Sequence, residues 1–398
     1  MSKGIAITGM GIISSIGDTV EDNFHALRST VHGISRIEFL ETKHKDAIMV
    51  GEIKKTNKDL ENTLGLPAIN SFSRTAMIGA IAAKEALDNA KIDSIDKYRT
   101  GFVSGTSVGG MDMTERHYLK YHEIKENRRY IEAQHAGFTT ESISNYLGIR
   151  GYVSTISTAC SSAANAIMLG ARMIKAGKID RIVVGGTDAL SKFTINGFGT
   201  LMILSDEECT PFDENRKGLN LGEAAAYLVL ESDEIVTKEN KEVLGRVSGW
   251  ANANDAYHQT ASSSDGEGAY LAMKKALEVA NISSEDIDYI NAHGTATPNN
   301  DLSEGVAMTR IFGEDTIPTF SSTKAFTGHT LAAAGSVEAV YSILSLREHL
   351  IFPNLNFQTR MKEFSLIPQT ELISKEMKTI LSNSFGFGGN CSTLIFTR

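Results

Sequence analysis

Hydrophobic and polar positions follow two alternating patterns along this chain. Short β-branched runs flanked by glycine predict buried strands at 4–8, 101–104, 181–186 and 287–292. Ala-rich stretches with helical spacing predict helices at 76–90, 162–176, 268–280 and 336–346. Strands that alternate with helices favour sheets with parallel pairing whose faces are covered by helices. The pattern therefore predicts an α/β protein.

An internal repeat divides the chain. Residues 84–92 read KEALDNAKI and residues 274–282 read KKALEVANI, and each copy is followed by a strand-like run that ends in Gly-Thr. Later, STACSSA at 157–163 has a looser counterpart in STKAFTGHTLA at 322–332. These three similarities, the helical motif, the following Gly-Thr and the later Ser-Thr segment, occur in the same order and predict a duplicated α/β fold. We divide it into residues 1–235 and 236–398.

The first half carries a polar stretch at 111–145 that the second half lacks. It contains Arg128, Arg129 and several histidines. An insertion of this kind in one copy of a repeat is predicted to be a cap, or a dimer or partner surface.

Charge and cysteine content exclude several classes of protein. The chain has 39 basic and 48 acidic residues, a net charge of -9, so binding to nucleic acid through bulk positive charge is excluded. The three cysteines are widely spaced, which fits neither a disulfide framework nor a zinc site and suits a reducing cytosol. No apolar run is long enough for a membrane span, and the N-terminus has no signal-peptide pattern. We expect a cytoplasmic protein without a metal site.

Cys160 is the first candidate for chemistry. It follows a β-like run and precedes an Ala-rich helix. Unpaired N–H groups and the positive end of a helix dipole lower the pKa of a thiol at such a position. A lone cysteine is also commonly a buried, inert residue, so this context leaves both readings open.

Two histidines favour the nucleophile. His293 lies in NAHGTATP at the end of a strand-like run, and His329 lies in KAFTGH before another Ala-rich helix. Small neighbouring residues would let a substrate approach both rings. A cysteine with distant histidines is a candidate nucleophile arrangement.

Two other motifs are weaker. Gly9-Met10-Gly11 resembles the start of a dinucleotide fingerprint, but Ser14 stands at the third glycine position. The segment 105–109 matches G-x-S-x-G and keeps Ser107 as a minor hydrolase rival.

Four motifs of the chain belong together: STACSSA, NAHGTATPNND, STKAFTGH and the C-terminal NSFGFGGN. Together they resemble the motifs of the β-ketoacyl-acyl carrier protein synthases, and in particular of their elongating, two-histidine branch. They occur in the family order, together with an N-terminal KGIAITGMGIIS and a mid-chain TPFDENRKGLNLGEAAA. The resemblance implies a thiolase-like fold, in which two similar halves pack as five α-β-α-β-α layers.

The resemblance also implies roles for individual residues. Cys160 matches the acyl-accepting nucleophile, His293 and His329 match the histidine pair, and Lys324 matches the lysine of K-x-x-x-G-H. Glu304 matches an acid that helps to position the lysine, and Thr295 and Thr297 match threonines that contact the phosphopantetheine arm. Phe387 matches a gating aromatic residue whose backbone N–H contributes to the oxyanion hole, and Val108 matches a residue that lines the acyl pocket.

The implied reaction is a decarboxylative condensation of malonyl-carrier protein with an acyl group held on Cys160. No cofactor would be tightly bound, because the phosphopantetheine arm of the acyl carrier protein brings the substrates. A homodimer is expected, and a heterodimer with a related subunit is left open. Because that carrier protein is acidic, Arg74, Arg128 and Arg129 are candidates for a docking patch.

The sequence departs from the family pattern at several positions, so the acyl substrate and two alternative functions stay open. Leu219 replaces an aromatic that often gates the acyl pocket, which puts a housekeeping long-chain substrate in doubt and leaves a polyketide-type chain as an alternative. The first rival is a non-catalytic, chain-length-factor-like partner subunit. The second is a thiolase with a second catalytic cysteine, for which Cys391 lies near the expected region.

Overall fold

Two sets of five strands form the centre of the molecule. A computed structural model describes residues 4–398. The first set has the order β1-β8-β6-β4-β5, with bounds β1 Ile5–Ile13, β4 Thr100–Gly105, β5 Val153–Ile156, β6 Arg181–Asp188 and β8 Ala224–Glu231. The second set has the order β9-β15-β14-β10-β11, with bounds β9 Gly245–Asn254, β10 Tyr289–Asn291, β11 Thr319–Ser321, β14 Thr379–Gly386 and β15 Asn390–Thr397. The two sets meet where β1 pairs with β9.

The two sets have the same pairing pattern. In each, the three strands at the outer end run parallel, and the remaining pairings are antiparallel. Each set also has three helices at corresponding points of the chain. They are α3 Arg74–Asn89, α6 Ala136–Tyr146 and α7 Ser162–Lys175 in the first half, and α10 Glu267–Ala280, α11 Pro298–Phe312 and α13 Ala334–Glu348 in the second. The duplication indicated by the sequence repeat is therefore present in the strand topology.

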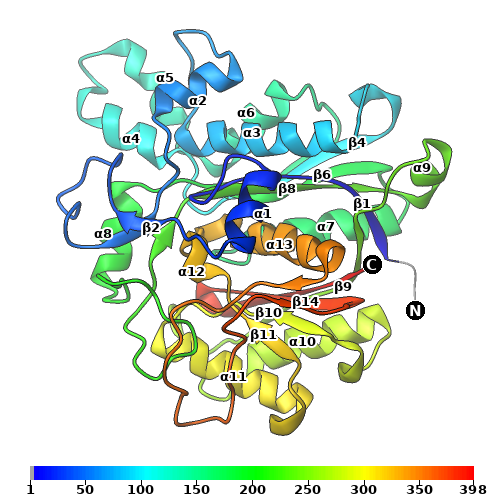
Figure 1. Ribbon diagram of the computed structural model, residues 1–398. Coiled ribbons are helices and arrows are strands. Elements are labelled where there is room, and N and C mark those ends of the chain that lie inside the picture. The colour runs from blue at the N-terminus through cyan, green and yellow to red at the C-terminus, as the bar shows by residue number, and fades with distance from the viewer. Residues whose placement is uncertain (1–3) are drawn as a thin grey trace.

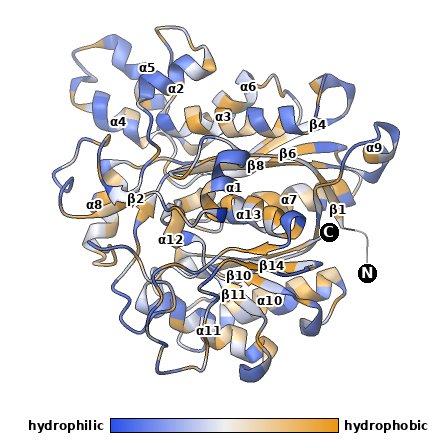
Figure 2. Cartoon of the chain, in the orientation of Figure 1, coloured by the Kyte–Doolittle hydropathy of each residue, from blue (hydrophilic) through white to orange (hydrophobic). Residues whose placement is uncertain are grey.

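Five layers follow from this arrangement (Figure 1). Helices α3 and α6 cover the outer face of the first set, α10 and α11 cover the outer face of the second, and α7 and α13 lie between them. Helix α13 is buried from Ala334 to Leu346, which a helix between two sheets requires. Hydrophobic residues follow the inner strands, whereas hydrophilic ones gather at the periphery (Figure 2). The predicted thiolase-like α/β fold is confirmed.

Glycines of β1 explain the Gly9-Met10-Gly11 motif. A Cβ on Gly9 would come within 2.3 Å of the Ala86 carbonyl oxygen, and one on Gly11 within 2.1 Å of the Ala82 carbonyl oxygen. The backbone of α3 therefore lies directly on β1, and the two glycines serve helix–strand packing.

The first half carries the longer connections. Between β1 and α3 lie α1 Val20–Arg28, β2 Ile34–Arg36, β3 Met49–Gly51 and α2 Asn57–Leu64. Between β4 and α6 lie α4 Met111–His117, two short 3-10 turns and α5 Arg128–Glu132, and between β6 and β8 lie α8 Lys192–Thr200 and β7 Leu221–Gly222. The remaining α-helices and strands of residues 4–398 are α9 Asp233–Lys238, α12 Lys324–Thr327, β12 Leu350–Ile351 and β13 Ile373–Ser374.

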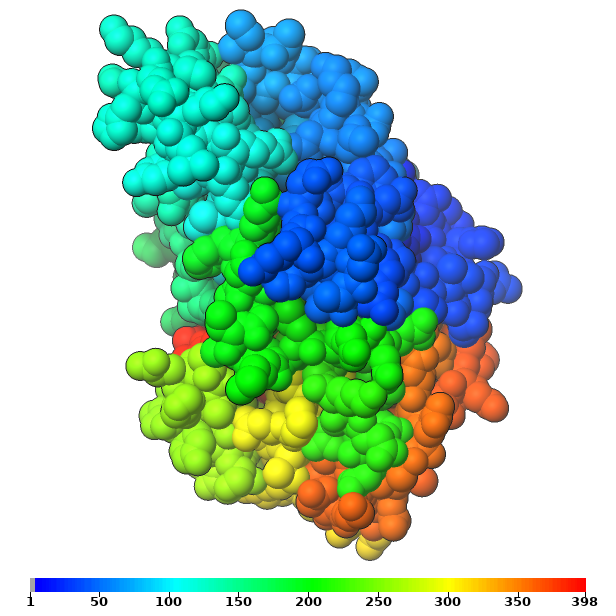
Figure 3. Space-filling view, turned by 90° about the vertical axis from the view of Figure 1, so that its left-hand side faces the viewer, coloured from blue at the N-terminus to red at the C-terminus, as the bar shows by residue number. Residues whose placement is uncertain are grey.

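The predicted insertion at 111–145 is wrong at its C-terminal end. Helix α6 begins at Ala136, packs on α3 and corresponds to α11 of the second half, so it belongs to the repeated plan. The extra segment is therefore residues 106–135, which form a projecting corner in cyan in Figure 3. The division at 235/236 stays a prediction.

Candidate functional site

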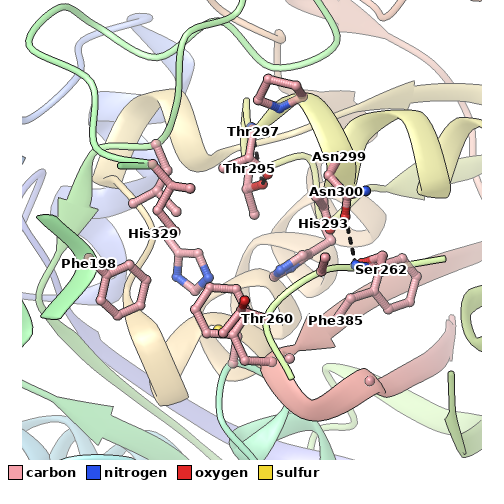
Figure 4. Close-up of a pocket in the computed structure, with 18 of the residues that line it drawn as sticks. Phe198, Thr260, Ser262, His293, Thr295, Thr297, Asn299, Asn300, His329 and Phe385 are labelled. Atoms are coloured by element: carbon pink, nitrogen blue, oxygen red, sulfur yellow. Dashed lines mark hydrogen bonds between the residues drawn. The ribbon is translucent and has the colours of Figure 1, made fainter. Parts of the chain in front are cut away.

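One cavity of about 320 Å³ brings Cys160, His293 and His329 together. Cys160 lies just before α7, His293 follows β10, and His329 follows α12. Both imidazole rings point into the cavity, where Thr295 and Thr297 lie above them (Figure 4). The site thus combines segments of both halves that are far apart in the sequence.

Cys160 occupies a tight turn between β5 and α7. The preceding Ala159 has a φ of 50°, a conformation that non-glycine residues rarely adopt. Burial raises the pKa of the Cys160 thiol to about 12, although the positive charge of Lys324 and the backbone N–H of Phe387 act in the opposite direction. The sequence had predicted a lowered pKa from the helix terminus, and burial reverses that direction, so the thiol is protonated at neutral pH.

The two histidines are neutral imidazoles. Their ring centroids lie 5.4 Å apart with the planes at 87°. Burial, and then the charge of Lys324, lowers the pKa of His329 to about 3, and the same causes hold the pKa of His293 well below its usual range. The backbone N–H of Leu331 donates to Nδ1 of His329 at 3.0 Å, which leaves the proton of that ring on Nε2.

Lys324 forms its ion pair with Glu338 of α13, and both side chains are buried. The expectation that Glu304 positions Lys324 is wrong. The Glu304 carboxylate instead accepts the backbone N–H groups of His293 and Gly294, each at 2.8 Å, and the side-chain amide of Asn383 at 3.0 Å. Glu304 therefore holds the backbone of the His293 loop.

Phe387 lies in the turn between β14 and β15. Gly388 and Gly389 on its C-terminal side both have a φ of 79°, which glycine adopts without strain. A Cβ on Gly386 would come within 2.8 Å of the Thr158 carbonyl oxygen and 3.1 Å of the Cys160 nitrogen. The turn therefore lies directly against the backbone that carries Cys160.

Cys160 also lines a second cavity of about 310 Å³. It is lined by Val108, Leu331 and aromatic side chains of α8, and its wall is apolar. Phe198 and Phe387 stack with ring centroids 5.6 Å apart and line both cavities together with Cys160. Val108 thus lies on the second cavity, whereas Leu219 lies on the first, beside Lys217. Ser107 lies on the second cavity as well, and none of its hydrogen bonds within residues 4–398 involves a histidine.

The three arginines of the candidate docking patch separate in the structure. Arg128 and Arg129 are exposed on the projecting corner. Arg74 is 7% exposed and forms an ion pair with Glu223, with Nη2 at 2.6 Å from Oε1 and Nε at 2.9 Å from Oε2. The prediction that Arg74 belongs to the docking patch is therefore wrong, because its guanidinium is buried and paired with Glu223.

Sequence reasoning missed three residues of the site. Glu338 is a single acid within the apolar run 331–346, which is a detectable signal for a buried partner. Asp188 ends the apolar strand β6 and gives a similar signal. Phe198 stands in no recognisable motif.

Within residues 4–398, no group of three or more His, Cys, Asp or Glu side chains could hold a metal ion. In the same part of the chain, no helix combines the length and the apolar character needed to cross a membrane.

Two domains of a known protein family match this chain. The domain described as "Beta-ketoacyl synthase, N-terminal domain" matches residues 2–235, and "Beta-ketoacyl synthase, C-terminal domain" matches residues 244–358. The chain belongs to the β-ketoacyl synthase family. Among β-ketoacyl synthases, 3-oxoacyl-[acyl-carrier-protein] synthase 2 of Staphylococcus aureus is 33% identical over 411 residues, covering 100% of this chain and 99% of that protein. The enzyme of the same name from Vibrio cholerae is 32% identical over 415 residues, covering 100% of both chains.

Solved β-ketoacyl synthase structures agree with this assignment. The ishigamide ketosynthase/chain length factor superposes with a TM-score of 0.92 at 26% identity, covering 99% of each chain. A chain of the complex between the ketosynthase ApeO and its chain length factor ApeC from Xenorhabdus doucetiae superposes with a TM-score of 0.86 at 31% identity, covering 99% of this chain and 98% of that chain.

Proposed function

We propose that this protein is a 3-oxoacyl-acyl carrier protein synthase, an acyltransferase that condenses malonyl-carrier protein with an acyl group held on Cys160. The observation that carries the proposal is the shared cavity of one thiol and two neutral imidazoles. Relatives that match the whole chain have this activity in their names, which supports the same assignment.

In the first half-reaction, the sulfur of Cys160 attacks the thioester of the acyl-carrier protein. The bond between the acyl carbon and the pantetheine sulfur breaks, and the bond to Sγ of Cys160 forms. The proton that Cys160 loses balances the one that the released pantetheine thiol gains. The buried thiol is protonated at rest, so its proton passes to the departing pantetheine sulfur as the bond to Sγ of Cys160 forms.

In the second half-reaction, malonyl-carrier protein loses carbon dioxide. The electron pair of the broken carbon–carbon bond passes to the thioester oxygen as an enolate. Nε2–H of His329 and the ring of His293 would donate hydrogen bonds to that oxygen, a type of contact whose loss typically costs about 2.7–4 kcal/mol. The enolate carbon then attacks the acyl carbonyl on Cys160, the bond from that carbon to Sγ breaks, and the released thiolate takes up a proton from solvent.

Other cavity residues take supporting roles in this proposal. The backbone N–H groups of Cys160 and Phe387 point at the sulfur, where they would bind the oxyanion of the acyl carbonyl. Thr295 and Thr297 line the first cavity, where the phosphopantetheine arm would enter. The apolar second cavity, with Val108, would hold the acyl chain.

The carrier protein would dock in part on Arg128 and Arg129. Both are exposed on the projecting corner and lie beside the aromatic rings of Tyr121 and Tyr130. Replacing both arginines with glutamate should raise the KM for the carrier protein, because like charges would then face an acidic partner. An unchanged KM would reject their role.

Acylation of the protein tests the proposal directly. The intact mass is measured after incubation with a panel of acyl-carrier proteins, beside a Cys160→Ala control. A gain of one acyl group that is absent in the control supports the nucleophile, and the accepted chains identify the pathway. No acylation by any donor would contradict the proposal and favour the non-catalytic partner subunit, which is the second role open to this fold.

A further inference from the structure

One buried carboxylate joins two loops that border the site. Asp188 ends β6 and is 0% exposed. Its carboxylate accepts hydrogen bonds from the Thr106 hydroxyl at 2.6 Å, from the Ser107 backbone N–H at 3.1 Å and from the Ala332 backbone N–H at 3.0 Å. The first two donors belong to the loop after β4, and the third belongs to the turn after His329.

Each of the two loops has a separate task in the proposed reaction. The loop after β4 carries Val108, whose backbone N–H also lies 3.4 Å from Asp188, and it forms one wall of the acyl cavity. The turn after His329 carries Leu331, which lines the same cavity and donates its N–H to Nδ1 of His329. Leu331 has a φ of 53°, so this turn is strained and needs external support to keep its shape.

Asp188 also acts on Cys160 through its charge. The groups that face the thiol electrostatically are Lys324, whose positive charge lowers the pKa of Cys160, and Asp188, whose negative charge raises it. The imidazoles of His293 and His329 share the cavity but are neutral. Burial raises the pKa of Asp188 itself, whereas the hydrogen bonds from Thr106, Ala332 and Ser107 favour its ionised form, so its effect on Cys160 follows the ionised fraction of this carboxyl group.

We propose that Asp188 is a positioning residue that couples the acyl cavity to His329, because its carboxylate fixes both the 106–108 loop and the 331–333 turn. The inference rests on the proposed function. It implies that occupation of the acyl cavity, which presses on both loops, is transmitted to the ring that stabilises the enolate.

The test compares Asp188→Asn with Glu52→Gln. Glu52 is a matched control, because it is 2% exposed and its carboxylate accepts backbone N–H groups of residues 38–40, away from Cys160. Two rates are measured: alkylation of Cys160 by iodoacetamide at pH 8, followed by peptide mass, and decarboxylation of malonyl-carrier protein. Folding of both variants is checked by thermal unfolding.

In Asp188→Asn we expect faster alkylation, because the thiolate fraction of Cys160 rises when a nearby negative charge is removed. We expect decarboxylation to be about 10-fold to 100-fold slower, because His329 loses its fixed orientation. Glu52→Gln should change neither rate. A folded Asp188→Asn with wild-type rates in both assays would overturn the proposal.

A second variant covers the case in which Asp188→Asn does not fold. Thr106→Val removes one donor and leaves the contact to Ala332, so acyl transfer to Cys160 should slow, and an acyl group on Cys160 should accelerate decarboxylation less than it does in the wild type. Wild-type rates in both steps would overturn the coupling. Alkylation requires no condensing activity, so a wild-type protein that fails to decarboxylate malonyl-carrier protein would reject the proposed function without deciding the role of Asp188.

Discussion

The buried ion pair of Arg74 and Glu223 supports a quantitative prediction. The guanidinium makes two short contacts to the carboxylate and donates to the Ile53 and Lys55 carbonyl oxygens at 3.1 and 2.9 Å. The Glu223 side chain is 1% exposed, so replacing Arg74 with methionine leaves a carboxylate without a counter-charge in the interior. Breaking one half of such a pair costs about 3–5 kcal/mol of unfolding free energy.

This free energy converts to a shift in melting temperature. The entropy of unfolding is about 2.1 cal/mol/K per residue, which for 398 residues is about 0.84 kcal/mol/K. Arg74→Met should therefore lower the Tm by about 4–6 °C. Adding Glu223→Gln should restore part of this loss, because the amide removes the unpaired charge and its single oxygen can still accept one of the two N–H groups, of Ile53 and Leu190, that bind separate oxygens of the carboxylate.

The assay is thermal unfolding followed by circular dichroism. The control is Asp88→Asn, which breaks the exposed pair of Lys84 and Asp88 and should change the Tm by less than about 1 °C. An Arg74→Met variant that melts within 1 °C of the wild type would refute the reasoning, as would a double variant no more stable than the single one. A raised KM for the carrier protein without a change in Tm would restore Arg74 as a docking residue.

Three further predictions concern the site. Burial lowers the pKa of His329 to about 3, so the decarboxylation rate should show no inflection near pH 6.5, and an inflection there would contradict the neutral state of this ring. The contribution of His329 to the free energy of unfolding should be complete above pH 6.5 and should be lost as the pH falls toward 3. Phe198→Ala removes the stack on Phe387 and should lower kcat/KM for acylation by about 2-fold to 10-fold, measured with acyl groups of different chain lengths. If kcat/KM of the variant equals that of the wild type for every acyl group, the stack does not shape the acyl site. Cys391→Ala should leave acylation of Cys160 unchanged in the intact-mass assay, and loss of acylation would support the thiolase rival.

Two of the similar solved structures, the ishigamide protein and the complex of ApeO with ApeC, are described as a ketosynthase with a chain length factor. Cys160, His293 and His329 are all present in this chain, and their shared cavity favours the catalytic role.

Many strands and helices could be predicted from the sequence, because secondary structure depends largely on the residue pattern within a short segment. The strand and helix predictions at 181–186 and 162–176 agree with β6 and α7, since β-branched runs and Ala-rich helical spacing have few other stable outcomes. The repeat at 84–92 and 274–282 falls on α3 and α10, which occupy the same place in the two halves. The sequence motifs also identified the thiol and both imidazoles of the cavity.

Other properties depend on which groups the fold brings together. The partner of Lys324 is Glu338 and not Glu304, and Arg74 is internal and not at the surface, because ion pairing in the interior depends on the packing of distant elements. The pKa of Cys160 is raised and not lowered, because burial removes the water that would solvate a thiolate, and this outweighs the local effect of a helix terminus. The sequence by itself determined the elements, the duplication and the reactive residue types. Only the tertiary structure decided their protonation states and partners, because desolvation and charge pairing are set by neighbours that lie far apart along the chain.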